Sequence, residues 1–272
     1  MRLGTDHLGH KEKQIMETSK VTFRCGCDPE VFLQDMQGKL ISAIGYIKAD
    51  KWNPLQIPDM EKGYTLQEDN VSLEYGVPPA ASADEFIHHI RAVMEKSKEW
   101  LPGLQFSNLS CAVFPEDQMQ HPLAHIFGCE PDYNAWTGLS NPKPQPPHPF
   151  MRSAGGHVHI ETAENPWQVI KAVDLYLGVP SVLMDKGEER KQLYGKAGAC
   201  RVKSYGPEYR TLSNFWIFED HLIKWVWDNV GRALENLSIN YDEIGDQIQE
   251  CINNNNKELA HYLVQKYNLQ VV

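Results

Sequence analysis

Charged side chains at every second position of short strand-like segments constrain this chain more than any other sequence feature. Side chains two residues apart on a strand point to the same face of a sheet. Most of the six polar signatures follow this spacing: residues 26–33 (GCDPEVFL), 69–74 (DNVSLE), 155–160 (GGHVHI), Lys196, 201–203 (RVK) and 208–210 (EYR). One sheet face would then carry carboxylates, imidazoles and guanidinium groups. Burying unpartnered charges costs several kcal/mol, so this pattern indicates a ligand site rather than a stabilising feature.

Composition excludes several classes of protein. The 272 residues carry a formal charge of −10, whereas binding to a phosphate backbone needs clustered Lys and Arg, so we expect no nucleic-acid partner. We expect no membrane span, because no run of about 18 apolar residues occurs. The amino terminus lacks the apolar core of a signal peptide, which predicts a cytoplasmic protein. The six cysteines are scattered and form no CxxC pair, as is typical of reduced thiols.

The strand pattern predicts a largely antiparallel sheet. We expect Pro78-Pro79 to stop one strand and Gly206-Pro207 to form the turn of a hairpin. The predicted strands are residues 21–33, 40–44, 70–75, 109–114, 157–160, 198–205 and 208–212.

Helix signals follow the strands without regular alternation. Ser82 and Glu85 form a capping box that predicts a helix to about Trp100. A second helix should begin at Pro166 and break near residues 178–180. Three more are expected at about 218–237, 241–252 and 256–267, and a Pro- and Gly-rich loop at 134–150. This order favours an α+β fold with one domain over 21–272, a helical C-terminal part at about 218–268, and a flexible arm at 1–20.

The residue types in these signatures indicate metal and phosphate chemistry. Asp28 and Glu30 share a face, and two close carboxylates repel unless a cation lies between them. His157 and His159 also share a face, and paired imidazoles bind metal ions or phosphate oxygens. The cationic pair of Arg201 and Lys203 lies across the expected hairpin from Glu208 and Arg210, where an Arg fork suits phosphate. Each motif alone is also compatible with an ordinary solvated strand; their joint occurrence favours a site.

The order of these motifs resembles that of the glutamine synthetase-like carboxylate–amine ligases. The stretches GCDPEVFL, AGGHVHI and EYRTLSNFW are most similar to the phage-type amidoligase branch. The resemblance implies a glutamine synthetase-like catalytic fold, in which a curved antiparallel sheet is backed by helices. It implies ATP with Mg²⁺ or Mn²⁺ as cofactors. By this resemblance the metal ligands are Asp28, Glu30, Glu74, His157 and Glu208, and the phosphate-binding and catalytic residues are His159, Lys196, Arg201, Lys203 and Arg210.

The resemblance also implies a reaction. A carboxylate would attack the γ-phosphate of ATP to give an acyl phosphate, and an amine would then form the amide. The substrates would be small-molecule or peptide acids and amines, and the protein would be phage-encoded. One more carboxylate that relatives use has no clear match here, and Glu130 or Asp132 would serve.

Two alternatives remain open at the level of sequence. His157, His159 and Glu164 imitate the HxH(x)₄E motif of a cupin-like metal enzyme, although a later Gly and a distant His are missing. The other alternative is a non-enzymatic phage protein that binds a partner through its helical C-terminal part. Oligomeric state and substrate identity have no sequence signal.

Overall fold

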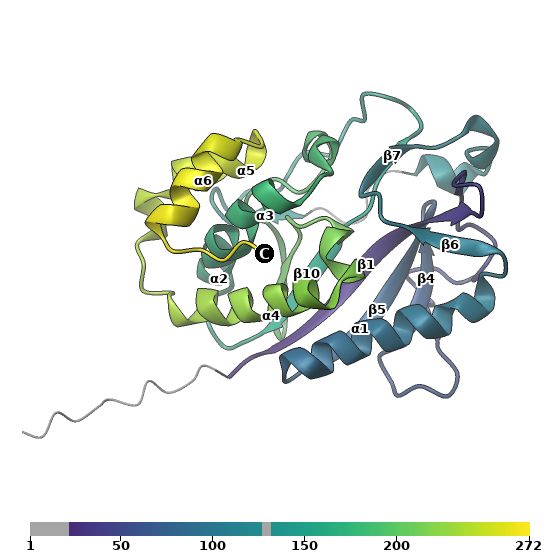
Figure 1. Ribbon diagram of the computed structural model, residues 1–272, viewed down its shortest axis with the longest axis horizontal. Helices are drawn as coiled ribbons and strands as arrows, with labels where there is room; N and C mark the ends of the chain where they lie inside the picture. The colour runs from purple at the N-terminus through teal and green to yellow at the C-terminus, as the bar shows by residue number, and fades with distance from the viewer. Residues whose placement is uncertain (1–21, 127–131) are drawn as a thin grey trace, which may run out of the picture.

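A large antiparallel sheet organises the molecule (Figure 1). The computed structural model describes residues 22–126 and 132–272. Within them, the strand order of the main sheet is β3-β4-β5-β1-β10-β12-β11-β8, and β2 and β6 also pair with β1. Its strands are β1 (Arg24–Asp35), β2 (Leu40–Ile41), β3 (Leu55–Gln56), β4 (Thr65–Asp69), β5 (Ser72–Ala80), β6 (Leu104–Ser107), β8 (Tyr133–Asn134), β10 (Gly156–Glu161), β11 (Ala199–Lys203) and β12 (Gly206–Tyr209). A separate two-stranded sheet pairs β7 (Cys111–Val113) with β9 (Met151–Ser153).

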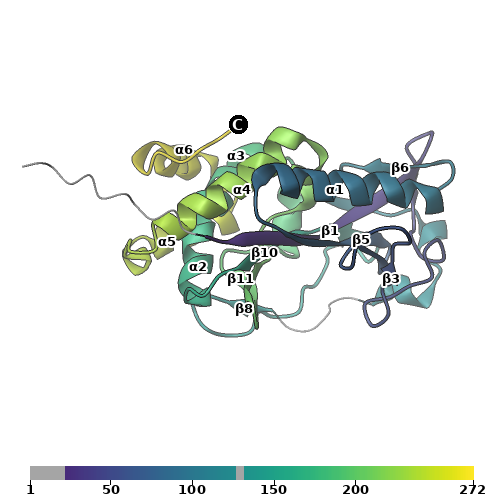
Figure 2. The ribbon, with the colours of Figure 1, turned by 90° about the horizontal axis from the view of Figure 1, so that it is seen from below.

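Helices cover one face of the main sheet. The α-helices are α1 (Ala83–Ser97), α2 (Pro166–Val173), α3 (Val179–Met184), α4 (Asp220–Glu235), α5 (Gly245–Asn253) and α6 (Lys257–Lys266). Figure 2 shows α1 and α4 on the same side of β1 and β5. The strand residues on that side, such as Cys27, Val31, Leu73 and Val158, are buried in one hydrophobic core with the helices. Alternation along each strand therefore leaves the residues between them on the opposite face.

The prediction of mixed helices and a large antiparallel sheet is confirmed. The predicted capping box is present, since the Ser82 hydroxyl accepts from the Glu85 N–H and the Glu85 carboxylate accepts from the Ala81 N–H. The predicted arm at 1–20 lies outside the described residues, and the single-domain assignment stays a prediction. Across the described ranges, no helix combines the length and apolar character that crossing a membrane requires.

Three local predictions were wrong. Pro78 and Pro79 lie inside β5, which continues to Ala80 where the register with β1 shifts, so the irregular pairing accommodates two residues without N–H donors. Gly206 belongs to β12, because Lys203 pairs with it and Ser204-Tyr205 form the turn. The predicted break at 178–180 is instead a π-helical turn, η4 (Asp174–Gly178), which joins α2 to α3.

Candidate functional site

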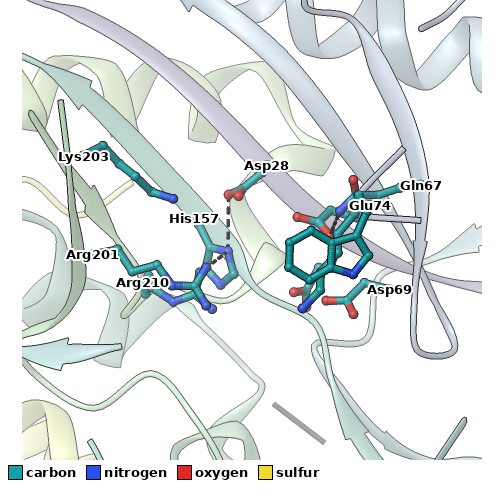
Figure 3. Close-up of a pocket in the computed structure, with 11 residues that line it drawn as sticks. Asp28, Gln67, Asp69, Glu74, His157, Arg201, Lys203 and Arg210 are labelled. Carbon is teal, nitrogen blue, oxygen red and sulfur yellow. Dashed lines mark hydrogen bonds and ion pairs between the residues drawn. The ribbon is translucent and has the colours of Figure 1, made fainter. Parts of the chain in front are cut away.

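Strand register brings the polar signatures together on the sheet face opposite α1 and α4. Residues that pair directly across antiparallel strands share a face. These polar residues form a row across the strands. From the middle of the sheet towards β11, the paired residues are Asp28 with His157, His159 with Glu208, and Glu208 with Arg201. Two pairs extend it the other way: Glu30 with Glu74, and Glu74 with Gln67. Figure 3 shows Asp28, His157, Arg201, Glu74 and Gln67 of this set converging on one site.

The converging side chains line a cavity of about 280 Å³. Its lining residues are Asp28, Glu30, Lys51, Trp52, Gln67, Asp69, Glu74, His157, Arg201, Lys203 and Arg210. Arg201, Lys203 and Arg210 lie at one end, and Gln67, Asp69 and Glu74 lie at the other (Figure 3). Asp28 and His157 lie between the two ends. The cavity therefore has a cationic end and an acidic end.

Asp28, His159 and Glu208 form a group with the donor types of a metal site. Their ligand atoms lie within 4.8 Å of one another. Buried Asp28 Oδ1, His159 Nε2 and Glu208 Oε2 make no hydrogen bond, although Asp28 Oδ1 lies 3.2 Å from His159 Nε2 and Glu208 Oε2 lies 3.2 Å from Lys203 Nζ. Buried polar atoms without hydrogen bonds are uncommon and call for a partner. A divalent cation bound by two carboxylates and one imidazole would provide that partner.

The charge state of this group suits a metal or a phosphate. Burial opposes ionisation of Asp28, but the charges of His159 and His157 at close range outweigh burial and hold the pKa of Asp28 well below its usual value. Burial would lower the pKa of His159, yet the Asp28 charge beside it raises the pKa overall. Burial and the Asp28 charge oppose ionisation of Glu208, but Arg210 and both histidines lower its pKa. Both carboxylates are therefore ionised at neutral pH.

Glu208 is the centre of the cationic end. Only 1% of its side chain is exposed, and Arg201 Nη1 lies 3.5 Å and Lys203 Nζ 3.2 Å from its oxygens. Arg210 donates a hydrogen bond to Glu208 and contacts His157 Nδ1 at 3.3 Å, and its Nε lies 3.6 Å from Asp132. Burial would lower the pKa of Arg210, but the charges of Glu208 and Asp28 raise it. Three cations around one carboxylate leave capacity to bind further anionic oxygens.

The acidic end holds carboxylates that resist ionisation. Burial, and then the charges of Asp28, Asp69 and Glu30, raise the pKa of Glu74 well above its usual value, although its Oε2 accepts a 2.5 Å hydrogen bond from Gln67. Burial and the Glu30 charge raise the pKa of Asp69 to about 6, while the Lys51 charge opposes that rise. Mutual repulsion of this kind is relieved by a bound cation.

Glycine permits the close approach that orients β10. A Cβ on Gly156 would lie 2.4 Å from the Ser213 carbonyl oxygen and 2.5 Å from Trp216 Nε1. Next to it, the Gly155 N–H donates to Glu30 Oε2 at 2.7 Å, and the Gly155 carbonyl accepts from the Glu30 N–H at 2.8 Å. Gly155 and Gly156 therefore let the backbone approach its neighbours closely just before His157.

Lys196, like His159 and Glu208, is a sequence-predicted site residue that does not line the cavity. Its Nζ donates to the Asn253 carbonyl oxygen at the end of α5, 3.0 Å away. Gly195 and Gly198 have φ values of 75° and 77°, so the chain turns on both sides of Lys196 before β11 begins. Lys196 thus lies in a turn before β11, and the phosphate-binding role that the resemblance implies for it stays a prediction.

Both histidines lie beside Asp28. The resemblance implies His157 as a metal ligand and His159 as a phosphate-binding group, and these roles stay predictions; by distance, His159 groups with Asp28 and Glu208. His157 lies 3.3 Å from Asp28 on the other side, between it and Arg210. Of the two extra carboxylates, Asp132 contacts Arg210, and Glu130 lies outside the described residues.

Sequence reasoning missed four lining residues: Lys51, Trp52, Gln67 and Asp69. Asp69 lies inside the signature at residues 69–74, and the turn that follows it determines which face of the sheet it occupies. Asn70 has a φ of 57°, and Asn70-Val71 form a two-residue turn between β4 and β5. That register places Gln67 opposite Glu74 and puts Asp69 on the same face. Lys51 and Trp52 lie in a loop before β3 and had no comparable signal.

Asp174 connects the strands of the cationic end to the helices behind them. This fully buried residue of η4 accepts hydrogen bonds from the Tyr209 hydroxyl (2.8 Å), Trp136 Nε1 (2.7 Å) and the Gly198 N–H (2.6 Å). Tyr209 lies between Glu208 and Arg210, and Gly198 precedes β11. Asp174 thus fixes the two strands that carry the cationic side chains, and the π-helical turn presents it to them.

The same burial makes stability depend on pH. Burial raises the pKa of Asp174 to about 6, although its hydrogen bonds oppose the rise. Because the folded pKa lies above the unfolded value of about 3.9, the folded state binds more protons between those values, and stability falls as the pH rises from about 4 to 6. We expect the difference in unfolding free energy between the wild type and Asp174→Asn to shrink by on the order of 3 kcal/mol between pH 4 and pH 7.

Urea unfolding at both pH values measures this change. Asp228→Asn is the control, because Asp228 is partly exposed in an ion pair with Lys224 on α4. If the difference in unfolding free energy between the wild type and Asp174→Asn is equal at the two pH values, or larger at pH 7, the pH dependence assigned to Asp174 is wrong.

Comparison with known protein families addresses the resemblance directly. Residues 145–230 match a family model described as Phage phiEco32-like COOH.NH2 ligase-type 2. The sequence resemblance to phage-type carboxylate–amine ligases is confirmed. The matched segment is less than half of the chain, but it carries His157, Arg201 and Arg210, which line the cavity, and also His159 and Glu208 of the carboxylate–imidazole group. Asp28 and the acidic end lie outside it.

Other comparisons add little. No curated protein matches the sequence. Among solved structures, a bifunctional glutathione synthetase from Pasteurella multocida aligns with 91% of this chain at 12% identity and a TM-score of 0.40. The chain covers 49% of that protein. A TM-score this low carries no conclusion about fold or function.

The cupin-like alternative loses support from the geometry. Glu164, its third motif residue, is exposed and lies just before α2 rather than facing His157 and His159. A cupin-like site would need a β-barrel there. The tryptophans of the helical C-terminal part are also accounted for by packing, because Trp216 and Trp225 are buried in the core.

Proposed function

We propose that this protein is an ATP- and Mg²⁺-dependent carboxylate–amine ligase with a glutamine synthetase-like catalytic fold. The observation that carries the proposal is the carboxylate–imidazole group of Asp28, His159 and Glu208, which adjoins three cations around buried Glu208 beside the cavity. Such a site combines metal ligands with groups that neutralise phosphate charge. The family match over residues 145–230 supports the same reaction class.

The donor set is suited to Mg²⁺ or Mn²⁺. Asp28, His159 and Glu208 would hold one ion, and Glu30 and Glu74, with His157 nearby, would contribute to further binding. Hard cations prefer carboxylate oxygens, and one imidazole is compatible with Mn²⁺. A bound ion would supply charge neutralisation for the phosphates of ATP.

The residues of the cationic end have distinct tasks in this reaction. Arg201, Lys203 and Arg210 would bind the phosphate oxygens and stabilise the charge that develops during transfer. The oxygen of the acid substrate forms a bond to the γ-phosphorus while the bond to ADP breaks. The amine nitrogen then attacks the acyl carbon, inorganic phosphate leaves, and the nitrogen gives up a proton to form the amide. Asp174 supports these steps only through the position of β11 and β12.

Calorimetric titration of ATP and of ADP tests the proposal. We expect binding in the presence of Mg²⁺ and a large loss of affinity in EDTA, because the phosphates and carboxylates repel each other without a cation. Acid–amine pairs can then be screened for ADP release. Absence of nucleotide binding under both conditions would overturn the proposal.

A further inference from the structure

The acidic end of the cavity is lined by residues that do not belong to the carboxylate–imidazole group. Asp69 and Gln67 on β4 face this end, opposite the cationic end (Figure 3). The loop before β3 adds Lys51 and Trp52 to its lining. Trp52 lines the cavity and yet is 76% exposed, so its ring stands at the mouth rather than in the core. The Trp52 ring therefore lines the same cavity as Asp69 and Glu74 while leaving one of its faces open to a ligand.

The contacts of Lys51 indicate which chemical group the acidic end of the cavity can bind. Its Nζ lies 4.9 Å from the centroid of the Trp52 ring, within the range of a cation–π contact. The same ammonium acts electrostatically on Asp69. Lys51 is thus a primary alkylammonium over an aromatic face, and it lines the same cavity as Asp69.

We propose that the amine substrate is a protonated primary alkylamine, whose ammonium takes the place of the Lys51 ammonium between the Trp52 ring and Asp69. This inference rests on the proposed ligase function, because it assigns the second substrate of that reaction. The acid substrate and ATP would occupy the cationic end, so the amine approaches from the opposite side. The ammonium releases one proton to solvent before its nitrogen attacks the acyl carbon and a second as the amide forms, while phosphate leaves.

Trp52 and Lys51 are specificity-determining residues in this scheme, with opposite effects. Trp52 supplies the face that favours a cation over a neutral group of the same length. Lys51 occupies that face in the free protein and must be displaced. Removing the ring should therefore weaken alkylammonium binding, whereas removing the Lys51 charge should strengthen it.

The experiment uses the full chain without ATP or an acid substrate. The probe is n-pentylammonium chloride, and 1-pentanol is the neutral control of matched length, both titrated by calorimetry at pH 7 with Mg²⁺ present. We expect only pentylammonium to bind. Trp52→Ala should weaken it about three- to tenfold, Trp52→Phe should retain most of the affinity, and Lys51→Met should strengthen binding severalfold.

Tyr262→Ala provides the matched control, because Tyr262 is an exposed aromatic on α6 with Lys266 over its ring at 5.4 Å. This variant should bind pentylammonium as the wild type does. Equal binding of pentanol, an unchanged affinity in both Trp52→Ala and Lys51→Met, or displacement of the probe by Mg²⁺ would overturn the inference. Titration of Mg²⁺ and ATP into the same preparation reports on the ligase proposal separately, so either can fail alone.

Discussion

Asp28→Asn lowers the affinity for Mn²⁺ by at least about 100-fold, the largest effect that we expect from a single substitution. Loss of a residue that only orients a metal ligand lowers metal affinity about 10- to 100-fold, so loss of a ligand itself should lower the affinity by as much or more. Asparagine keeps the size of the side chain but removes the charge that His157 and His159 contact at 3.3 and 3.2 Å. The free Mn²⁺ signal in electron paramagnetic resonance measures the affinity directly and needs no substrate.

Asp117→Asn is the control for this substitution. Asp117 is exposed and paired with Lys39 at 2.6 Å, away from the cavity lining. It should leave Mn²⁺ affinity unchanged. Circular dichroism and thermal unfolding of Asp28→Asn separate a lost ligand from a lost fold. A folded Asp28→Asn that binds Mn²⁺ like the wild type would remove Asp28 from the metal site.

Arg210→Lys weakens the binding of Mg²⁺-bound ATP by roughly 10- to 100-fold. Charge-assisted hydrogen bonds contribute about 1.5–3 kcal/mol, and every 1.4 kcal/mol is tenfold in affinity. The guanidinium spans Glu208, His157 and Asp132 at once, and the compact ammonium of lysine cannot replace that fork. The positive charge that balances buried Glu208 is kept, so the fold should survive.

Arg91→Lys tests whether such an exchange is harmful in general. Arg91 on α1 pairs with Asp220 at 2.6 Å and donates to the Ile217 carbonyl, outside the cavity lining. Calorimetric titration should give this variant a nucleotide affinity close to that of the wild type. If folded Arg210→Lys bound ATP equally well, the cationic end would not be the phosphate site.

Much of the site could be read from residue spacing because strand geometry is local. Asp28 and Glu30 alternate with buried Cys27 and Val31, and His157 and His159 alternate with buried Val158 and Ile160. The apolar partners identify the core face, and so the charged residues must share the other. The same rule gives no information on Lys196, which lies in a turn between two glycines with positive φ rather than on a strand.

Loops and packing could not be read in this way. Trp52 and Lys51 reach the cavity from a loop. The path of that loop depends on contacts with β4, such as the hydrogen bond from the Glu68 N–H to the Ala49 carbonyl, rather than on a repeating sequence pattern. Asp174 looked like an ordinary helix residue in sequence. Its role arises because α2 and η4 pack behind β11 and β12, where its carboxylate meets three donors.

By itself, then, the sequence determined which face of each strand would be polar, because alternation is a property of the backbone. It also determined the chemistry of that face, since residue types carry their own charge and ligand preference. Only the tertiary structure decided which strands are neighbours, and therefore that Asp28, His159 and Glu208 lie together. Register between distant strands depends on the packing of the whole sheet against its helices, which no local spacing encodes.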